Sequence, residues 1–387
     1  MHNAGPEARV AIVGAALSDI GRVDDKSAWE LHFQAAARAV ADAGLTRADI
    51  DGIGGGAIGN LAPIELAEYL GIKPTWVDGT VTGGSMWIFQ LQHAVEAIRA
   101  GHAETILLVY GSTARADLKA GRRGTSNLSF GARGPVQFDA PFGHTLISKY
   151  AMAATRHMHE FGTTIDQLAE IAVSTRFNAS HNPEAYYRDP ITRDDVHDSR
   201  MMATPLTKLH CCIRSDGGGA VVVTSAARAR DCAKAPIWVL GTGQATSHTT
   251  MTDWDDFTES PAVHSGRRAF AEAGITPADI DLCEIYDAFT PMVLLSLEAL
   301  GFCAKGEGGP FVEDGRLRLG GALPTNTDGG GLSHCHPGMR GMFLMVEAVR
   351  QLRGEAIGRQ VADARLACVN GTGGWWSSAA TAILGVD

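Results

Sequence analysis

The stretch 326–341 combines the residue types best suited to chemistry in this chain, because three glycines at 329–331 precede His336 and Pro337. Glycines let a backbone approach a substrate closely, and an imidazole gains or loses a proton near neutral pH. A helical pattern begins at Met342, so free N–H groups are expected beside the imidazole. The segment predicts a loop for proton transfer and anion binding. A His336 that only hydrogen-bonds the loop is the alternative interpretation.

Tyr286 is the second residue that could move a proton. It lies in the run EIYDAF at 284–289, after an expected strand. The ordinary pKa of a phenol, about 10, makes it a poor base, so His336 is the better proton acceptor on intrinsic grounds. Asp287 is expected to be a hydrogen-bond partner rather than a general acid.

The cysteines are seven, an odd number, and include no CxxC pair. They are Cys211, Cys212, Cys232, Cys283, Cys303, Cys335 and Cys368. Free cysteines usually pack as small hydrophobic residues, so we expect reduced thiols, no disulfide and no metal site. Cys335 is the candidate nucleophile among them because it adjoins His336.

Composition limits the classes of function. The 387 residues are 45% hydrophobic and 20% charged, as in a globular protein with a sizeable core. A formal net charge of −10 argues against a nucleic-acid partner. No apolar run reaches the roughly 18 residues of a membrane span, and no signal peptide is evident, so a cytoplasmic protein is expected. The glycine-rich turns complete neither GxGxxG nor GxxxxGK, which argues against a nucleotide site.

An internal repeat predicts how the elements are arranged. Residues 39–51 read AVADAGLTRADID and residues 269–281 read AFAEAGITPADID, identical at nine of thirteen positions. Each copy is typical of an amphipathic helix that ends at Gly44 or Gly274, followed by a short turn capped by threonine and then a strand. A second, looser similarity joins VEAIR at 95–99 to VEAVR at 346–350, and it predicts a further helix and strand in each half.

The repeat divides the chain into two homologous α/β halves. The first comprises residues 1–111 with 218–246, and the second comprises 247–387. Residues 112–217 have no counterpart in the second half and form an inserted loop domain, with helices expected at 147–161 and 165–178. Such insertions commonly carry substrate specificity. A β-branched run at 219–225 predicts a buried strand that closes the first half.

Taken together, these features resemble the thiolase superfamily, in particular the branch of sterol-carrier-protein-type thiolases and lipid-transfer-protein aldolases. The resemblance covers nearly the whole chain and rests on the duplicated halves and several motifs. The motifs are Gly329-Gly330 with His336-Pro337, GTGG at 371–374, LHCC at 209–212, SDG at 215–217 and YDAF at 286–289. The resemblance implies the five-layered α/β/α/β/α thiolase fold, with two halves around a central pair of helices. It also implies a homodimer.

The family pattern asks for a nucleophilic cysteine before the first central helix, where a thiolate gains from the positive helix end. The stretch 77–85 matches this region, and Val81 stands at the position of the cysteine. The second cysteine of the family has no clean counterpart, because Cys368 lies one or two positions early. The resemblance leaves backbone N–H groups near Val81 and in Gly373 and Gly374 as the oxyanion and substrate-binding site, with a purely structural turn as the alternative.

A tyrosine at position 286, where thiolases have Asn or His, resembles the aldolases that cleave the side chain of steroid CoA thioesters and lack the thiolase cysteine. Retro-aldol cleavage needs no acyl-enzyme, only a base for the β-hydroxyl proton and donors for the enolate oxygen. We therefore predict a carbon–carbon lyase that cleaves a β-hydroxyacyl-CoA with a bulky side chain, such as a steroid, into a ketone and a short acyl-CoA. Tyr286 and His336 would share the proton transfers.

Two other functions stay open on the sequence. One is a thiolase or acyltransferase that uses Cys335, and the other is a non-catalytic carrier of acyl-CoA or lipid. The aldolase resemblance also implies a small partner protein with an OB-like domain and a zinc ribbon, the DUF35 type. It implies a CoA thioester as substrate and no tightly bound cofactor.

Overall fold

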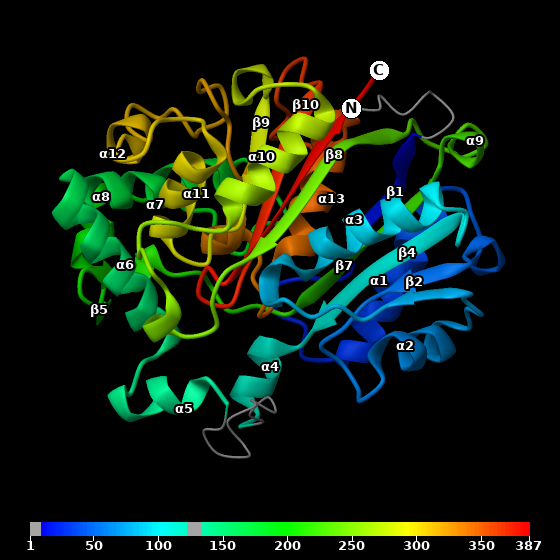
Figure 1. Ribbon diagram of the computed structural model, residues 1–387, viewed down its shortest axis with the longest axis horizontal. Coiled ribbons are helices and arrows are strands. Elements are labelled where there is room, and N and C mark those ends of the chain that lie inside the picture. The colour runs from blue at the N-terminus through cyan, green and yellow to red at the C-terminus, as the bar shows by residue number, and fades with distance from the viewer. Residues whose placement is uncertain (1–8, 122–133) are drawn as a thin grey trace.

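The computed structural model describes residues 9–121 and 134–387 (Figure 1). The strands are β1 Val10–Leu17, β2 Gly52–Gly54, β3 Trp76–Asp78, β4 Thr105–Ser112, β5 Met201–Ala203, β6 Leu206–Thr207, β7 Gly217–Ser225, β8 Ile237–Thr246, β9 Leu282–Ile285, β10 Leu366–Gly373 and β11 Ser378–Gly385. The helices are α1 Ala28–Asp42, α2 Ala62–Leu70, α3 Met86–Arg99, α4 Ala114–Lys119, α5 Val136–Asp139, α6 Leu146–Phe161, α7 Ile165–Ser180, α8 Arg193–Asp198, α9 Ala226–Ala229, α10 Ala262–Ala273, α11 Thr290–Leu300, α12 Gly308–Phe311 and α13 Gly341–Leu352.

One mixed sheet runs through the molecule in the order β3-β2-β4-β7-β1-β8-β11-β10-β9. The first five strands of this order lie within residues 10–225, and the last four lie within residues 237–385. Two residue pairs, Ala11 with Trp238 and Ile12 with Ile237, join β1 to β8. The two sheets of the expected fold are therefore continuous through a narrow seam.

Helices cover both faces of each half of the sheet (Figure 1). Helix α1 packs on β1, β4 and β7, and α10 packs in the same way on β8 and β11. Helices α3 and α13 lie between the two halves, contact strands of both, and pack on each other. This alternation of helices and strands confirms the predicted thiolase-like α/β fold with two central helices.

The repeated sequence has the same structure in both halves. Helix α1 is followed by Gly44 at φ 71°, and α10 ends at Gly274 at φ 70°. Thr46 and Thr276 then cap short 3-10 turns that lead into β2 and β9. The predicted helix, turn and strand are thus confirmed in each copy.

The predicted helices of the inserted segment are present as α6 and α7, and the β-branched run is part of β7. Helix α7 packs against α11 of the second half, so the insertion reaches across the molecule (Figure 1). The residue boundaries of the halves and of the inserted domain stay a prediction. Residues 1–8 and 122–133 of those parts lie outside the described residues.

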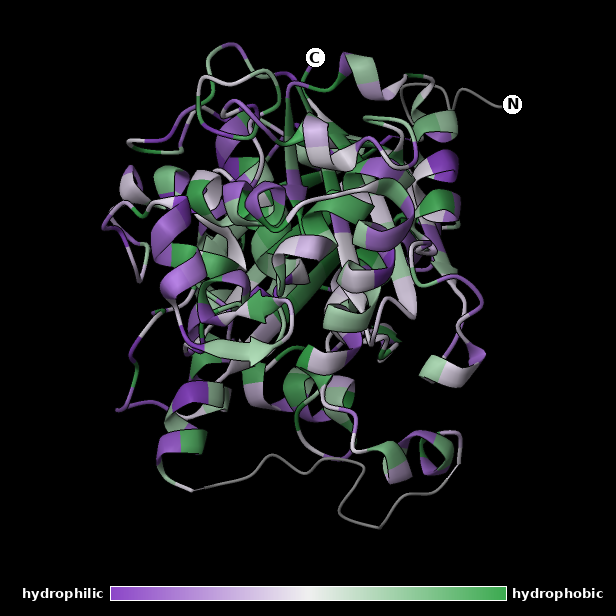
Figure 2. Cartoon of the chain, turned by 90° about the vertical axis from the view of Figure 1, so that its left-hand side faces the viewer, coloured by the Kyte–Doolittle hydropathy of each residue, from purple (hydrophilic) through white to green (hydrophobic). Residues whose placement is uncertain are grey.

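Apolar residues concentrate on the sheet and the central helices, whereas the outer helices carry polar residues on their outer faces (Figure 2). Nearly every residue of α13 is buried, as expected for a helix enclosed between two halves of a sheet. Within residues 9–121 and 134–387, no helix is both long enough and apolar enough to cross a membrane.

The outer helices approach the sheet closely at glycines, two of which are related by the repeat. A Cβ on Gly14 of β1 would lie 2.1 Å from the carbonyl oxygen of Ala39, and a Cβ on Gly241 of β8 would lie 2.1 Å from that of Ala269. Ala39 and Ala269 occupy the same position of the repeat. The same helix–strand contact has therefore been built twice, and it requires a residue without a side chain.

We expect Gly14→Ala and Gly241→Ala each to lower the free energy of unfolding by about 1–3 kcal/mol, because the added methyl group overlaps backbone atoms that cannot move aside. Chemical denaturation followed by circular dichroism measures the change. Thr246→Ala at the exposed end of β8 is the control and should change stability by less than about 0.5 kcal/mol. Equal stability of the three variants would contradict the close-contact interpretation.

Candidate active site

Tyr286 follows β9 directly, and its backbone N–H donates to the carbonyl of Asn370 in β10 at 2.9 Å. The side chain is 5% exposed. Its phenol oxygen lies 3.1 Å from Nε2 of His336, and the two rings meet edge to face. The structure therefore brings together the two residues predicted for proton transfer.

His336 lies between a π-helical turn, Gly330–His334, and helix α13. Its backbone N–H donates to Oγ of Ser215 at 2.9 Å, and the phenol of Tyr110 donates to the carbonyl of Pro337 at 2.6 Å. Strand β4 and the segment just before β7 thus hold the loop in place. The imidazole is fixed where it meets Tyr286.

Burial sets the protonation states of this pair. It lowers the pKa of His336 to about 4, with a smaller contribution from the positive charge of Arg340. It also raises the pKa of Tyr286 well above its ordinary value, and Cys212 adds to this effect. At neutral pH the imidazole is neutral and the phenol keeps its proton, so in the tautomer with its proton on Nδ1 the imidazole accepts from the phenol O–H at Nε2. A neutral acceptor then faces an O–H donor, an arrangement that suits a proton relay.

The N-terminal ends of both central helices meet beside Tyr286. A Cβ on Gly84, just before α3, would lie 2.3 Å from Cε2 of the tyrosine ring. A Cβ on Gly341, the first residue of α13, would lie 2.3 Å from the carbonyl oxygen of Gly84. Helix N-termini carry partial positive charge, so this place favours a negative charge that develops on a substrate.

The predicted oxyanion segments lie against each other. A Cβ on Gly83 would lie 2.9 Å from the backbone nitrogen of Gly374, and Ser378 donates from Oγ to the carbonyl of Thr82 at 2.8 Å. The side chain of Val81, by contrast, is 63% exposed and lies near Gly56. The backbone next to Val81 is therefore joined to Gly373 and Gly374, whereas its side chain is largely exposed to solvent.

Cys335 is poorly placed to be a nucleophile. It is fully buried, its Sγ lies 3.1 Å from Oγ of Ser215, and it donates to the carbonyl of Asp216 at 3.7 Å. Burial raises the pKa of its thiol to about 12, so the reactive thiolate is scarce at neutral pH. Cys368 is also buried, in β10, opposite Cys283 of β9.

Of the buried polar residues beneath the site, the sequence motifs singled out Asp287 but neither Asp328 nor Arg340. Asp287, Asp328 and Arg340 are buried and joined by ion pairs under the loop of His336. Asp287 was expected to be a hydrogen-bond partner, and it is. An arginine within a glycine-rich loop was the available signal for Arg340. Ser215 lies in the SDG motif, but nothing in the sequence indicates that it contacts His336.

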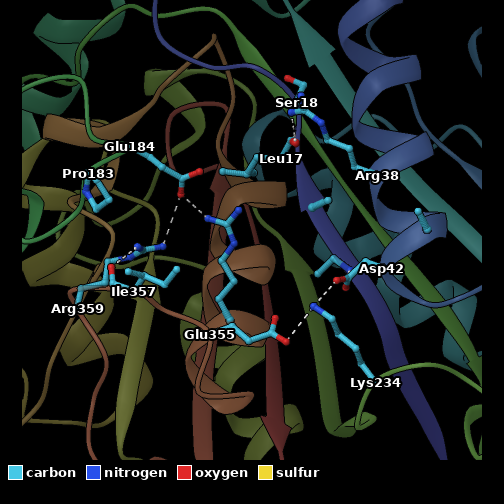
Figure 3. A pocket seen from close by; sticks show the side chains of 14 residues that line it. Leu17, Ser18, Arg38, Asp42, Pro183, Glu184, Lys234, Glu355, Ile357 and Arg359 are labelled. Atoms are coloured by element: carbon cyan, nitrogen blue, oxygen red, sulfur yellow. Dashed lines mark hydrogen bonds and ion pairs between the residues drawn. The ribbon is translucent and has the colours of Figure 1, made fainter.

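No group of three His, Cys, Asp or Glu side chains in the described part of the chain is arranged to hold a metal ion. A cavity of about 770 Å³ opens between β1, α1 and the end of α13 (Figure 3). Its charged side chains pair with one another, for example Glu184 with Arg350 and Lys234 with Glu355. Neither Tyr286 nor His336 lines it, so we place the candidate chemistry at the buried pair instead.

Comparisons with known proteins give a consistent result. The family described as "Thiolase C-terminal domain-like" matches residues 243–386. The chain is 36% identical over 379 residues to 17-hydroxy-3-oxo-4-pregnene-20-carboxyl-CoA lyase of Mycobacterium tuberculosis, covering 94% of this chain and 97% of the relative. It is 35% identical over 386 residues to an acetyl-CoA acetyltransferase of Methanothermobacter thermautotrophicus, covering 97% and 98%. The solved structure of an Ltp2-ChsH2(DUF35) aldolase superposes with a TM-score of 0.88 at 33% identity, covering 98% of both chains.

The lowered pKa of His336 predicts a pH-dependent stability. The unfolded chain binds a proton below about pH 6.5, whereas the folded chain does not until about pH 4, so the free energy of unfolding falls as the pH falls between these values. His336→Asn should reduce this slope by up to about 1.4 kcal/mol per pH unit. Denaturation from pH 4 to 8 measures it. His102→Asn at an exposed site is the control, and an unchanged slope for His336→Asn would contradict the assignment.

Proposed function

Because the chain belongs to the thiolase superfamily, in the branch of the steroid side-chain-cleaving aldolases, we propose that it is a carbon–carbon lyase that acts on a CoA thioester. The reaction is retro-aldol cleavage of a β-hydroxyacyl-CoA with a bulky side chain such as a steroid. It releases a ketone and a shorter acyl-CoA. The observation that carries the proposal is the hydrogen bond of 3.1 Å between Tyr286 and His336, in a chain with valine at the nucleophile position.

The pair supplies both proton transfers of this reaction. The phenol oxygen of Tyr286 takes the β-hydroxyl proton while its own proton passes to Nε2 of His336. The carbon–carbon bond then breaks, its electron pair forms the thioester enolate, and the hydroxyl carbon becomes the ketone. His336 returns the proton to the enolate carbon. An imidazole with a lowered pKa is a weak acceptor but a strong donor once charged, which favours this return step.

The enolate oxygen is the negative charge that the site must stabilise. The N-termini of α3 and α13 converge beside Tyr286, and the backbone near Val81 lies against Gly373 and Gly374. We propose that the backbone N–H groups of these segments donate hydrogen bonds to the enolate oxygen. They are already oriented in the fold and need no rearrangement during the reaction. Valine at position 81 offers no atom that could form an acyl-enzyme.

The partner and assembly follow from the same family membership. The solved aldolase with a TM-score of 0.88 is described with a DUF35 protein, and this supports a DUF35-type partner for the present chain. We also propose a homodimer and assign the specificity for the side chain to the inserted segment 112–217. The CoA thioester is the substrate, and no further cofactor enters the mechanism.

The similarity to an acetyl-CoA acetyltransferase leaves acyl transfer as the competing activity. That reaction requires a thiolate, and Cys335 is fully buried with a pKa raised to about 12. A non-catalytic carrier is the remaining alternative. It would bind acyl-CoA without turnover and would have no need for Tyr286 and His336.

Replacing the proton-transfer residues should abolish cleavage without unfolding the protein. We expect Tyr286→Phe and His336→Ala each to reduce kcat at least about 10²-fold, because each removes one step of the relay. The assay supplies β-hydroxyacyl-CoA substrates of several side-chain sizes, with and without the DUF35 partner, and detects ketone and acyl-CoA by mass spectrometry. Tyr69→Phe on the exposed side of α2 is the control. Folded variants that cleave as fast as the parent would overturn the assignment.

Loss of the Cys335 thiol should matter little. We expect Cys335→Ser, which keeps a hydrogen-bonding partner for Ser215, to retain kcat within about threefold, since the proposed reaction forms no acyl-enzyme. Turnover mixtures should yield no acylated peptide. A large loss of activity together with an acyl group trapped on Cys335 would establish acyl transfer instead.

A further inference from the structure

Tyr286 and His336 belong to different segments, so their separation depends on whatever joins those segments. Tyr286 is the first residue after β9, and His336 lies in the loop that leads to α13. A hydrogen bond of 3.1 Å between their side chains tolerates little displacement. Asp287 is the residue next to Tyr286, and it contacts the His336 loop directly.

Asp287 uses both carboxylate oxygens on that loop. Oδ1 accepts from the backbone N–H of Gly331 at 2.7 Å, and Oδ2 accepts from that of Leu332 at 3.2 Å. Both donors lie in the π-helical turn that precedes His336. The side chain is fully buried, so no water replaces a lost bond at low cost.

Arg340 fastens the other end of the same loop. Its guanidinium donates to both oxygens of Asp328 at 2.5 and 2.7 Å and to the carbonyl of Cys335 at 3.0 Å. Its Nε lies 3.4 Å from Oδ1 of Asp287. Asp328 accepts in turn from the N–H of Gly330 at 2.8 Å. The buried charges thus form one unit, which we call the loop anchor: Asp287, Asp328 and Arg340.

We infer that Asp287 is a positioning residue, which sets the contact between Tyr286 and His336 by tying the His336 loop to the end of β9. The expected effect of Asp287 on kcat rests on the proposed function. The expected effect of Asp287 on the position of the His336 imidazole does not, so the two effects can be tested separately. An asparagine at this position has a single acceptor oxygen and would turn its NH2 group toward an N–H donor, which loses one of the two bonds.

The charge of Asp287 adds a pH dependence to the anchor. Burial raises the pKa of this carboxyl to about 7, while Arg340 opposes the rise. The titratable and charged groups that face it are Arg340, Asp328, Cys212 and Tyr286. The ionised carboxylate accepts hydrogen bonds from the N–H groups of Gly331 and Leu332. Protonation turns one carboxylate oxygen into an O–H donor, which then faces one of these N–H donors and can no longer accept from it. Lowering the pH through about 7 should therefore loosen the loop.

Asp287→Asn tests the inference, with Glu298→Gln as the matched control. Glu298 is a buried carboxylate that also accepts a backbone N–H, from Gly308 at 2.8 Å, and pairs with His157, away from the His336 loop. We expect Asp287→Asn to lower kcat about 10²-fold with little change in KM, and to remove the fall of kcat below pH 7. Glu298→Gln should keep the kinetics and the pH profile of the parent.

The position of the imidazole is measured without substrate, from the ¹⁵N chemical shift of Nε2 in protein labelled at histidine. We expect the shift of His336 to move in Asp287→Asn and to stay in Glu298→Gln. An unchanged shift in Asp287→Asn would overturn the inference. A moved shift with unchanged kcat would confirm the anchor and refute the catalytic roles given to Tyr286 and His336. If Asp287→Asn does not fold, the Nε2 shift of His336 is measured in the parent protein between pH 8 and 6. We expect the shift to move as Asp287 becomes protonated, and a constant shift would overturn the inference.

Discussion

The buried guanidinium of Arg340 constrains the loop that carries His336 in the candidate site. Arg340 has no exposure to solvent, and a charge in that position is tolerated only where carboxylates and carbonyls surround it. Asp328 and Asp287 supply the carboxylates, and both also accept backbone N–H groups of the loop that carries His336. The same two carboxylates therefore neutralise the arginine and fix the shape of the loop. This double use explains why so polar a network lies inside an apolar core.

In the proposed function, two neutral side chains take the place of the nucleophile of a thiolase. Valine stands where the resemblance places the cysteine, and Tyr286 lies beside His336 in a pair that burial keeps uncharged. In the proposed reaction the proton passes through both side chains, so each holds it for one step. Under this proposal, the helix ends that would assist a thiolate hold an oxyanion instead. The chemistry then changes at a few positions, Val81 and Tyr286 among them, while the thiolase-like fold is kept.

The repeat and the motifs predicted the fold well because they depend on local rules. Glycine stops, threonine caps and alternating helix and strand patterns are written in short stretches of sequence, and the structure confirms them in both halves. The motifs also pointed to Tyr286 and His336, which the structure places in contact. The contacts of Ser215 and Arg340 were not predicted, because they join segments far apart in sequence and depend on how the halves pack. The exposure of Val81 could not be predicted either, since a matched motif fixes a position along the chain and not the direction of a side chain.

The seam between β1 and β8 consists of only two residue pairs, yet the site draws on both sides of it. Gly84 comes from the first half, and the ring that it touches comes from the second. So short a seam contributes few of the contacts that hold the halves together. The packing of α3 and α13 on each other and on strands at both sides of the seam therefore has to supply the rigidity that keeps Gly84 against the ring of Tyr286.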